Sequence, residues 1–333
     1  MSSSISTPVN DLSQVGEARR SARKVCAALT PNETFAGRVA LVITELARNL
    51  VLHAGGGQIV VREVQEGPNA GVEVLALDRG PGMRNVGECL RDGFSTSGTP
   101  GTGMGAIRRI ADVFDLSTAE GRGTAICTRF FFRKEDYEPR WCFGGVNVPV
   151  LGEDICGDAW AIQEMGEKVR VVVADGLGHG PYAADASREA VKVFLESGEH
   201  ALAEVLRRMD GALTKTRGAA VAVAEISPKD SQIVVAGAGN IVVRIFDREG
   251  KSKQIASVNG TVGGRIHKIQ EFTGAWSSES LLVMHTDGLT SHWDLGVYPG
   301  LLQRIPATIA GVLYRDYARK RDDATVVTLS SYR

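Results

Sequence analysis

Four apolar segments in the second half of the chain each carry aspartate at one end. The clearest is "VRVVVADG" at 169–176, a strongly apolar run that ends in Asp-Gly. Short apolar runs bounded by glycine are typical of strands buried on both faces. We therefore expect a sheet protein whose buried strands present carboxylates at their ends. These carboxylates belong to Asp158, Asp175, Asp287 and the adjacent pair Asp322 and Asp323.

Carboxylates gathered at neighbouring strand ends need neutralisation, because burying like charges together is otherwise very unfavourable. Four ionised carboxylates carry about four negative charges, which two divalent cations would cancel. Oxygen ligands favour magnesium or manganese over zinc, and a two-metal centre activates water to cleave phosphoesters. The pattern thus predicts a hydrolytic two-metal site. A hairpin turn is the alternative explanation for any single Asp-Gly pair.

Three separated segments of the first half fit one nucleotide-binding site. Glu45 and Asn49 lie four residues apart in "ITELARNLVLHAGGG", so a helix places both on one face. Asp78 ends an apolar strand, and Gly80 and Gly82 permit a tight turn after it. A carboxylate fixed at a strand end can accept a hydrogen bond from the exocyclic amine of adenine.

The third segment is the glycine-rich "STSGTPGTGMGAIRRI" at 95–110, which leads into a helix expected over about 104–114. Unpaired backbone N–H groups and the positive end of that helix would bind phosphates. Asn49 would then hold magnesium through its side-chain oxygen, and Glu45 would take the proton from an incoming hydroxyl. His53, one turn after Asn49, is expected to be a packing or capping residue.

This order of motifs resembles the GHKL ATP-binding fold, and more closely the serine/threonine kinases of the RsbT type. The resemblance covers residues 8 to 132. It implies that ATP and Mg²⁺ bind here, with Glu45 as the catalytic base, Asn49 as the magnesium ligand and Asp78 as the adenine acceptor. The glycines that it places around the nucleotide are Gly80, Gly82, Gly101, Gly103 and Gly105.

The second half resembles metal-dependent protein phosphatases of the PP2C-like SpoIIE group, most closely the RsbX type. The segments "ICGDAW", "VVADGLGHG", "GAGNIVVRI", "HTDGL" and "RDDATVV" carry this resemblance over residues 142 to 331. It leaves the choice between Asp322 and Asp323 open. Larger family members use an arginine to clamp the substrate phosphate, and Arg140 is the hypothesis for that role here. The implied metal ligands are Asp158, Asp175 (bridging both ions), the Gly176 carbonyl, Asp287 and Asp322.

The charged segment "RKEDYEPR" contains a proline and has no apolar periodicity, which indicates a linker. A length of 333 residues also favours two domains. We therefore expect an α+β protein: a GHKL (Bergerat-type) ATP-binding α/β sandwich at 1–133, a linker at 134–140 and a PP2C-like α/β/β/α sandwich at 141–333. The Ser/Thr-rich N-terminus would form a flexible lead or an edge strand.

Composition excludes several other classes. The 38 Lys and Arg residues balance 39 Asp and Glu residues, which argues against a nucleic-acid-binding surface. No apolar run approaches the roughly 20 residues of a membrane helix, and the N-terminus lacks the features of a secretory signal. The five cysteines are scattered without a CxxC pair, so we expect reduced thiols and a cytoplasmic location.

These features predict a bifunctional signalling enzyme. The first domain would phosphorylate Ser or Thr with ATP and Mg²⁺, and the second would dephosphorylate with two Mn²⁺ or Mg²⁺ ions. The resemblance implies STAS-domain partners in a bacterial partner-switching (stressosome or anti-sigma-antagonist) pathway, without nucleic acid or membrane, and leaves a homodimer open. The alternative is a phosphatase whose first domain is a non-catalytic, ATP-gated binding module. A structural adaptor without metals is disfavoured by the retained aspartates.

Overall fold

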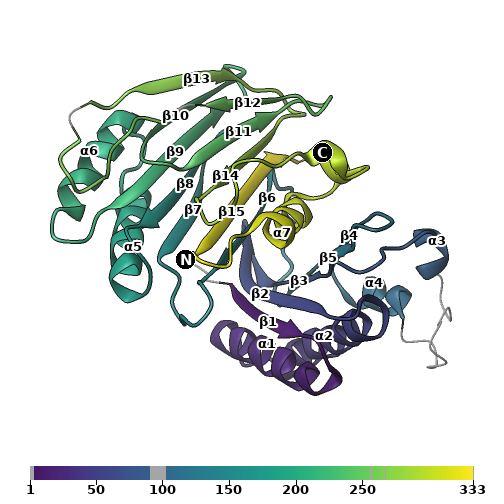
Figure 1. Ribbon diagram of the computed structural model, residues 1–333. Helices are drawn as coiled ribbons and strands as arrows, with labels where there is room; N and C mark the ends of the chain where they lie inside the picture. Colours follow the sequence, from purple (N-terminus) through teal and green to yellow (C-terminus); the bar gives the residue numbers. More distant parts are fainter. Residues whose placement is uncertain (1–3, 91–102, 256, 267, 333) are drawn as a thin grey trace. The chain divides into compact units, whose positions relative to one another are not determined.

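The computed structural model describes residues 4–90, 103–255, 257–266 and 268–332 (Figure 1). The chain forms two compact units. One comprises Ser2–Pro139 and Leu295–Arg315, and the other comprises Arg140–Asp294 and Asp316–Arg333. The segment Leu295–Arg315 therefore groups with the N-terminal unit, although it lies within the span 141–333 expected for the second domain.

The N-terminal unit contains a five-stranded sheet in the order β1-β2-β3-β5-β4, with every neighbouring pair antiparallel. Helices α1 and α2 lie along one face of this sheet (Figure 1). The strands are β1 (Ile5–Val9), β2 (Gly57–Glu66), β3 (Asn69–Leu77), β4 (Val113–Thr118) and β5 (Thr124–Phe131). The helices are α1 (Val15–Leu29), α2 (Glu33–Ala54), α3 (Val86–Cys89) and α4 (Met104–Ile110), with a 3₁₀ turn at Leu12–Gln14.

Local sequence signals explain the ends of α2, the helix that carries Glu45 and Asn49. The Asn32 side chain caps its start by accepting a hydrogen bond from the N–H of Phe35 at 3.0 Å. Gly55 ends it in the left-handed conformation, with φ of 73°. The buried residues of α2 recur at helical spacing and face the sheet.

Two expectations about smaller elements have clear outcomes. The N-terminal segment forms an edge strand, because β2 is the only described strand with which β1 pairs. The helix expected over 104–114 was too long: α4 ends at Ile110, and β4 begins at Val113. Pairing of β4 with β5 supplies the hydrogen bonds that a longer helix would have made internally.

The second unit contains two five-stranded antiparallel sheets, in the orders β13-β10-β9-β8-β7 and β12-β11-β14-β15-β6. Residues of both sheets share one apolar core, and α5 and α6 cover the other face of the first sheet. The first sheet is built of β7 (Asp158–Met165), β8 (Lys168–Gly176), β9 (Ala219–Ser227), β10 (Gln232–Ala238) and β13 (Glu271–Ala275). The second is built of β6 (Trp141–Val148), β11 (Val242–Phe246), β12 (Ser252–Ile255), β14 (Leu281–His285) and β15 (Ala324–Ser331).

The remaining elements are α5 (Pro181–Glu196), α6 (Leu202–Leu213) and α7 (Pro306–Tyr317), with 3₁₀ turns at Leu295–Val297 and Leu301–Gln303. All of α7 up to Arg315 belongs to the N-terminal unit. In the described part of the chain, no helix combines the length and apolar character needed to cross a bilayer.

Candidate functional sites

A cavity of about 460 Å³ in the N-terminal unit brings the predicted nucleotide-binding residues together. Glu45 and Asn49 line it from successive turns of α2, as their spacing predicts. Asp78 and Gly82 line it from the segment after β3, and Gly103 lines it from the start of α4. Its volume lies within the roughly 300–1,000 Å³ typical of cofactor sites.

Asp78 is held in one orientation by backbone donors. Its Oδ1 accepts the N–H groups of Gly80 at 2.8 Å and Thr124 at 3.1 Å. Its Oδ2 takes no hydrogen bond from the described residues, so it is available to an amine of a ligand. Burial raises the pKa of the Asp78 carboxyl, although these two N–H groups and Arg315 oppose the shift.

The glycines after Asp78 are required by close approaches of the backbone. A Cβ on Gly80 would lie 2.7 Å from the Cα of Ala54, the last residue of α2. Gly82 has a φ of 73°, and a Cβ there would collide with the carbonyl oxygen of Ala119. These two glycines therefore let the turn pack under the cavity.

The other predicted pocket residues have different positions. Gly103 is the N-cap of α4, and Gly105 is buried inside that helix. Gly101 lies outside the described residues. His53, expected to pack or cap, is in the last turn of α2 and lines the same cavity.

In the second unit, Asp158 and Asp175 lie opposite each other on two adjacent strands. They are direct partners in the antiparallel register of β7 and β8. Burial raises the pKa of the Asp158 carboxyl well above its usual range, and the negative charges of Asp323 and Asp322 add to this shift. Such mutual repulsion marks a place where a cation is favourable.

The pKa of Asp175 is raised in the same way. Burial is the largest cause, and the carboxylates of Asp158, Asp287 and Asp322 add to it. Because the effect depends on proximity, the four aspartates predicted from strand ends are electrostatic neighbours. Burial and Asp322 also raise the pKa of Asp287, which Arg319 partly opposes.

Asp322 and Asp323, the two candidates left open by the sequence, have different surroundings. Asp323 is 2% exposed, and its two carboxylate oxygens accept the N–H groups of Val150 and Gly157, each at 2.7 Å. These bonds use Asp323 to hold the loop before β7. Asp322 is less buried, and among the described residues its carboxylate accepts only the N–H of Asp323, at 2.9 Å, which favours Asp322 as a metal ligand.

The donor set suits a hydrated hard cation. Among the residues that the structure describes, no three Asp, Glu, His or Cys side chains are already gathered closely enough to hold one ion. Magnesium, however, usually keeps several waters and takes few protein oxygens. Separate carboxylates with the Gly176 carbonyl therefore fit hydrated Mg²⁺ or Mn²⁺, and they offer no soft ligand for zinc.

Two neutral side chains that the sequence analysis did not single out orient these carboxylates. The hydroxyl of Thr286 donates to Oδ2 of Asp158 at 2.8 Å, and the Asn240 amide donates to Oδ2 of Asp287 at 2.8 Å. Thr286 stands directly before Asp287, but Asn240 is 47 residues away in the sequence. Only the pairing of β11 with β14 brings Asn240 to this place.

The structure contradicts the hypothesis that Arg140 clamps the substrate phosphate. Along the pairing of β6 with β15, Val148 faces Ala324, next to Asp323, whereas Trp141 faces Ser331 at the other end. Arg140 precedes Trp141, and its guanidinium lies 3.6 Å from Glu167. The whole length of β6 therefore separates Arg140 from the carboxylates.

The two histidines near these motifs have distinct surroundings. His285 is fully buried in β14, where burial lowers its pKa to about 4, and its Nε2 accepts from the indole N–H of Trp293 at 3.0 Å. His285 is thus a neutral core residue. His179 is exposed and lies 2.8 Å from the carboxylate of Glu153.

Comparison with known proteins finds a matching family model for each half of the chain. The family model "Stage II sporulation protein E (SpoIIE)" matches residues 165–331, and "Histidine kinase-like ATPase domain" matches residues 9–130. The serine/threonine-protein kinase RsbT of Bacillus subtilis (strain 168) is 38% identical over 109 residues, which cover 33% of this chain and 82% of RsbT. The phosphoserine phosphatase RsbX of the same organism is 27% identical over 139 residues, covering 41% of this chain and 69% of RsbX.

Solved structures agree on the fold. A structure described as "The bacterial stressosome: a modular system that has been adapted to control secondary messenger signaling" has a TM-score of 0.53 and 25% identity, covering 57% of this chain and 98% of the other. A crystal structure of RsbX in complex with magnesium has a TM-score of 0.50 and 20% identity, covering 60% and 99%. The expected fold class, a GHKL-like ATPase domain followed by a PP2C-like domain, is confirmed. The chain belongs to the SpoIIE family through its second half and joins to it an N-terminal domain of the RsbT-like, histidine-kinase-type ATPase family.

Proposed function

We propose that this chain both phosphorylates and dephosphorylates Ser or Thr residues of STAS-domain proteins in a partner-switching pathway. Its second half is a PP2C-type serine/threonine phosphatase domain by family, and its first half is an ATP-binding domain of the RsbT-like type. The observation that carries the proposal is the presence, in one chain, of a cavity lined by Glu45, Asn49 and Asp78 and of a separate group of buried carboxylates.

In the first domain, bound ATP supplies the phosphoryl group that is transferred. Asp78 would accept the adenine amine through Oδ2, and Asn49 would hold Mg²⁺ through its amide oxygen. Glu45, one helical turn from Asn49, would take the proton of the Ser or Thr hydroxyl. The hydroxyl oxygen would bond to the γ-phosphorus as ADP leaves. A docked protein, rather than a small metabolite, would bring that hydroxyl to the cavity.

In the second domain, two divalent cations, when bound, supply Lewis-acid stabilisation and an activated water. Asp158, Asp175, Asp287 and Asp322 would hold these cations, with the Gly176 carbonyl as a further ligand. Thr286 and Asn240 fix the rotamers of Asp158 and Asp287, so the carboxylates are aimed before any cation arrives. The products would be a free Ser or Thr hydroxyl and phosphate.

The names of the two curated relatives support the choice of substrate. RsbT is named a serine/threonine-protein kinase and RsbX a phosphoserine phosphatase, and one solved neighbour belongs to the bacterial stressosome. We propose sequence limits of 1–133 and 141–333 for the two domains, with Leu295–Arg315 packed in the first unit, and a cytoplasmic location.

Transfer of labelled phosphate from ATP to a STAS-domain protein encoded in the same genome tests the kinase. We expect label on Ser or Thr that both Glu45→Ala and Asn49→Ala abolish. Binding of ATP without any transfer would instead favour the alternative, a phosphatase with a non-catalytic, ATP-gated module.

Cleavage of a phosphorylated STAS protein in Mn²⁺ tests the phosphatase. Asp175→Asn should abolish the manganese-dependent rate, while the Asn retains the shape of the side chain. An unchanged rate would remove the two-metal assignment. Because kinase and phosphatase acting on the same residue would waste ATP, we expect separate target residues or reciprocal control.

A further inference from the structure

Helix α7 belongs to the nucleotide-binding unit but lies in the sequence between two predicted metal ligands. Asp287 precedes it and Asp322 follows it. The segment Leu295–Arg315 nevertheless packs with the N-terminal sheet. A stretch of the phosphatase sequence is therefore part of the kinase-like unit.

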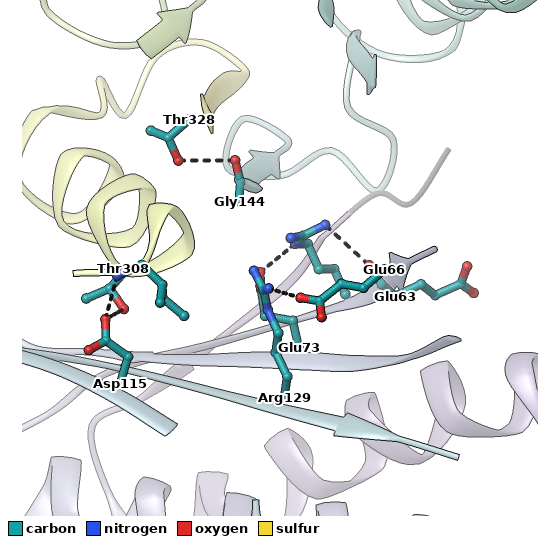
Figure 2. A network of polar contacts seen from close by, with 10 residues as sticks. Glu63, Glu66, Glu73, Asp115, Arg129, Gly144, Thr308 and Thr328 are labelled. Atoms are coloured by element: carbon teal, nitrogen blue, oxygen red, sulfur yellow. Dashed lines mark hydrogen bonds and ion pairs between the residues drawn. The ribbon is translucent and has the colours of Figure 1, made fainter. Parts of the chain in front are cut away.

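The start of α7 is fastened by Asp115 of β4. Its Oδ2 accepts the N–H of Ile305 at 3.0 Å and the hydroxyl of Thr308 at 2.7 Å, and Figure 2 shows the Thr308 contact. The guanidinium of Arg304 lies 3.5 Å from Oδ1 of the same carboxylate. Asp115 thus acts as an N-terminal cap that a different part of the chain supplies, and it satisfies donors that a helix start leaves unpaired.

The end of α7 is fastened at the nucleotide cavity. Nη1 of Arg315 donates to the main-chain carbonyl of Asp78 at 2.9 Å, and the guanidinium of Arg79 donates to the carbonyl of Arg315. Arg315 is 6% exposed. The residue whose side chain would accept adenine therefore holds the last turn of α7 through its backbone.

The middle of α7 packs closely on β3. A Cβ on Gly311 would lie 3.0 Å from Leu77 and 3.5 Å from Leu75, both on β3. Leu77 directly precedes Asp78, so α7 packs against the residues next to the predicted adenine acceptor.

The chain beyond α7 leads within a few residues to the carboxylates. Tyr317 accepts the N–H of Thr290 at 2.9 Å, and the N–H of Arg319 donates to the carbonyl of Gly288 at 2.6 Å. Ala318 and Leu289 form an isolated bridge. The segment between Arg315 and Asp322 is thus paired with the residues that follow Asp287, so a shift at the end of α7 has a short, hydrogen-bonded route to two predicted ligands.

We propose that nucleotide bound at Asp78 lowers the metal-dependent phosphatase rate of the same chain through α7. This inference rests on the proposed function of both sites. We expect nucleotide to lower the phosphatase rate, not raise it, because opposing activities at the same time would waste ATP. A coupling free energy of ordinary size corresponds to a change of about 5- to 150-fold, and linkage requires metal binding to weaken nucleotide affinity by the same factor that nucleotide weakens metal affinity.

The test measures hydrolysis of p-nitrophenyl phosphate by the full chain in fixed free Mn²⁺, with and without saturating AMP-PNP. AMP-PNP cannot transfer its terminal phosphoryl group under these conditions, and its binding is measured in parallel by calorimetry. We expect a rate at least about fivefold lower with nucleotide. Asp78→Asn, which alters the adenine acceptor, should lose this response, which separates it from chelation of manganese.

Thr308→Val removes the hydroxyl bond to Asp115 and keeps the shape of the side chain, so the response should shrink severalfold. Arg315→Lys tests the other end of α7 and should act in the same direction. The matched control is Thr328→Val, an equally buried threonine of β15 whose hydroxyl donates to Gly144 at 3.3 Å (Figure 2). Its response should equal that of the unaltered chain.

Three results would overturn the inference. One is an equal or higher rate with AMP-PNP bound; the proposed function then survives, because binding and hydrolysis are both seen. Another is a response that Thr308→Val and Arg315→Lys leave intact. Absence of AMP-PNP binding or of manganese-dependent hydrolysis would remove the proposed function itself, and this inference with it.

Discussion

Asp322 and Asp323 are adjacent in the sequence, but their carboxylates have different surroundings. The donors that occupy Asp323 come from Val150 and Gly157, 173 and 166 residues away. No local pattern around "RDDATVV" reveals those bonds, so the sequence left both aspartates as candidates. The strand-end position of each predicted ligand, in contrast, could be read directly, because apolar runs and the Asp-Gly pairs mark where strands end.

This difference predicts opposite phenotypes for two conservative substitutions. Asp323→Asn replaces one acceptor by an amide donor facing a backbone N–H, so the free energy of unfolding without metal should fall by about 1–3 kcal/mol. Asp322→Asn should leave that free energy unchanged or slightly higher, because it removes repulsion, and should lose manganese-dependent activity. Chemical denaturation and phosphopeptide hydrolysis measure the two effects. A stable Asp323→Asn beside a fully active Asp322→Asn would reverse the assignment.

Glu73 on β3 is the centre of a buried ionic network (Figure 2). Its carboxylate accepts from Arg62 Nε at 2.6 Å and Arg129 Nε at 2.8 Å, and Arg129 also pairs with Glu66. Burial alone would raise the pKa of Glu73, but the charges and hydrogen bonds of the two arginines outweigh it and hold the pKa below its usual value. The folded unit therefore favours the ionised form of Glu73 over the protonated form.

The sign of the pH dependence follows from that shift. A lowered folded pKa means that the stabilisation is fully present above the unfolded pKa of about 4.3 and is lost as pH falls through the lower folded value. Glu73→Gln should flatten this acid dependence and cost about 3–5 kcal/mol at pH 7, since it leaves buried arginines without their counter-charge. Denaturation of the full chain from pH 7 to pH 3 measures both. An acid limb as steep in Glu73→Gln as in the unaltered chain would contradict the role of this carboxylate.

Among the elements, β6 has a weak strand signal in its sequence. The segment "WCFGGVNV" contains two adjacent glycines, which weaken a strand signal. The structure explains one of them: a Cβ on Gly145 would lie 2.6 Å from the ring of Trp160 on β7. The contact with Trp160 thus requires glycine at position 145, and this glycine weakens the strand signal of β6. The overlong helix at 104–114 has the same kind of cause, because pairing with β5 decides where β4 begins.

Gly145→Ala should therefore destabilise the second unit by overpacking, by about 1–3 kcal/mol in the free energy of unfolding. The contrasting variant is Gly211→Ala in α6, where no atom lies within 4 Å of the added Cβ. It should be neutral or add up to about 1 kcal/mol, because alanine is the better helix former. Thermal denaturation with both variants in one buffer compares them. Equal effects of the two substitutions would show that the Trp160 ring moves to accommodate the added methyl group at little cost in free energy.

At the scale of the whole molecule, the chain passes between the two units three times within the residues that the structure describes: after Pro139, after Asp294 and after Arg315. The first crossing could be anticipated, because the segment that precedes it is charged, contains proline and lacks apolar periodicity. The other two could not. Contacts of α7 with Asp115, with Asp78 and with the leucines of β3 place it in the N-terminal unit, and all of these partners lie far away in the sequence. When long-range hydrogen bonds determine where a helix packs, its local sequence does not show to which unit it belongs.

These crossings give a prediction for unfolding of the intact chain. A ligand that binds only a folded unit stabilises it by about 2.7 kcal/mol at a hundred times its dissociation constant. If the units were independent, AMP-PNP would raise the melting temperature of one calorimetric transition and Mn²⁺ that of the other. Because α7 is packed in one unit and continues into the ligand segment of the other, each added ligand should instead shift both transitions. Thr308→Val should reduce the shift in the distant transition and keep the shift in the directly liganded one. Two transitions that each respond to a single ligand in the unaltered chain would show that α7 transmits nothing.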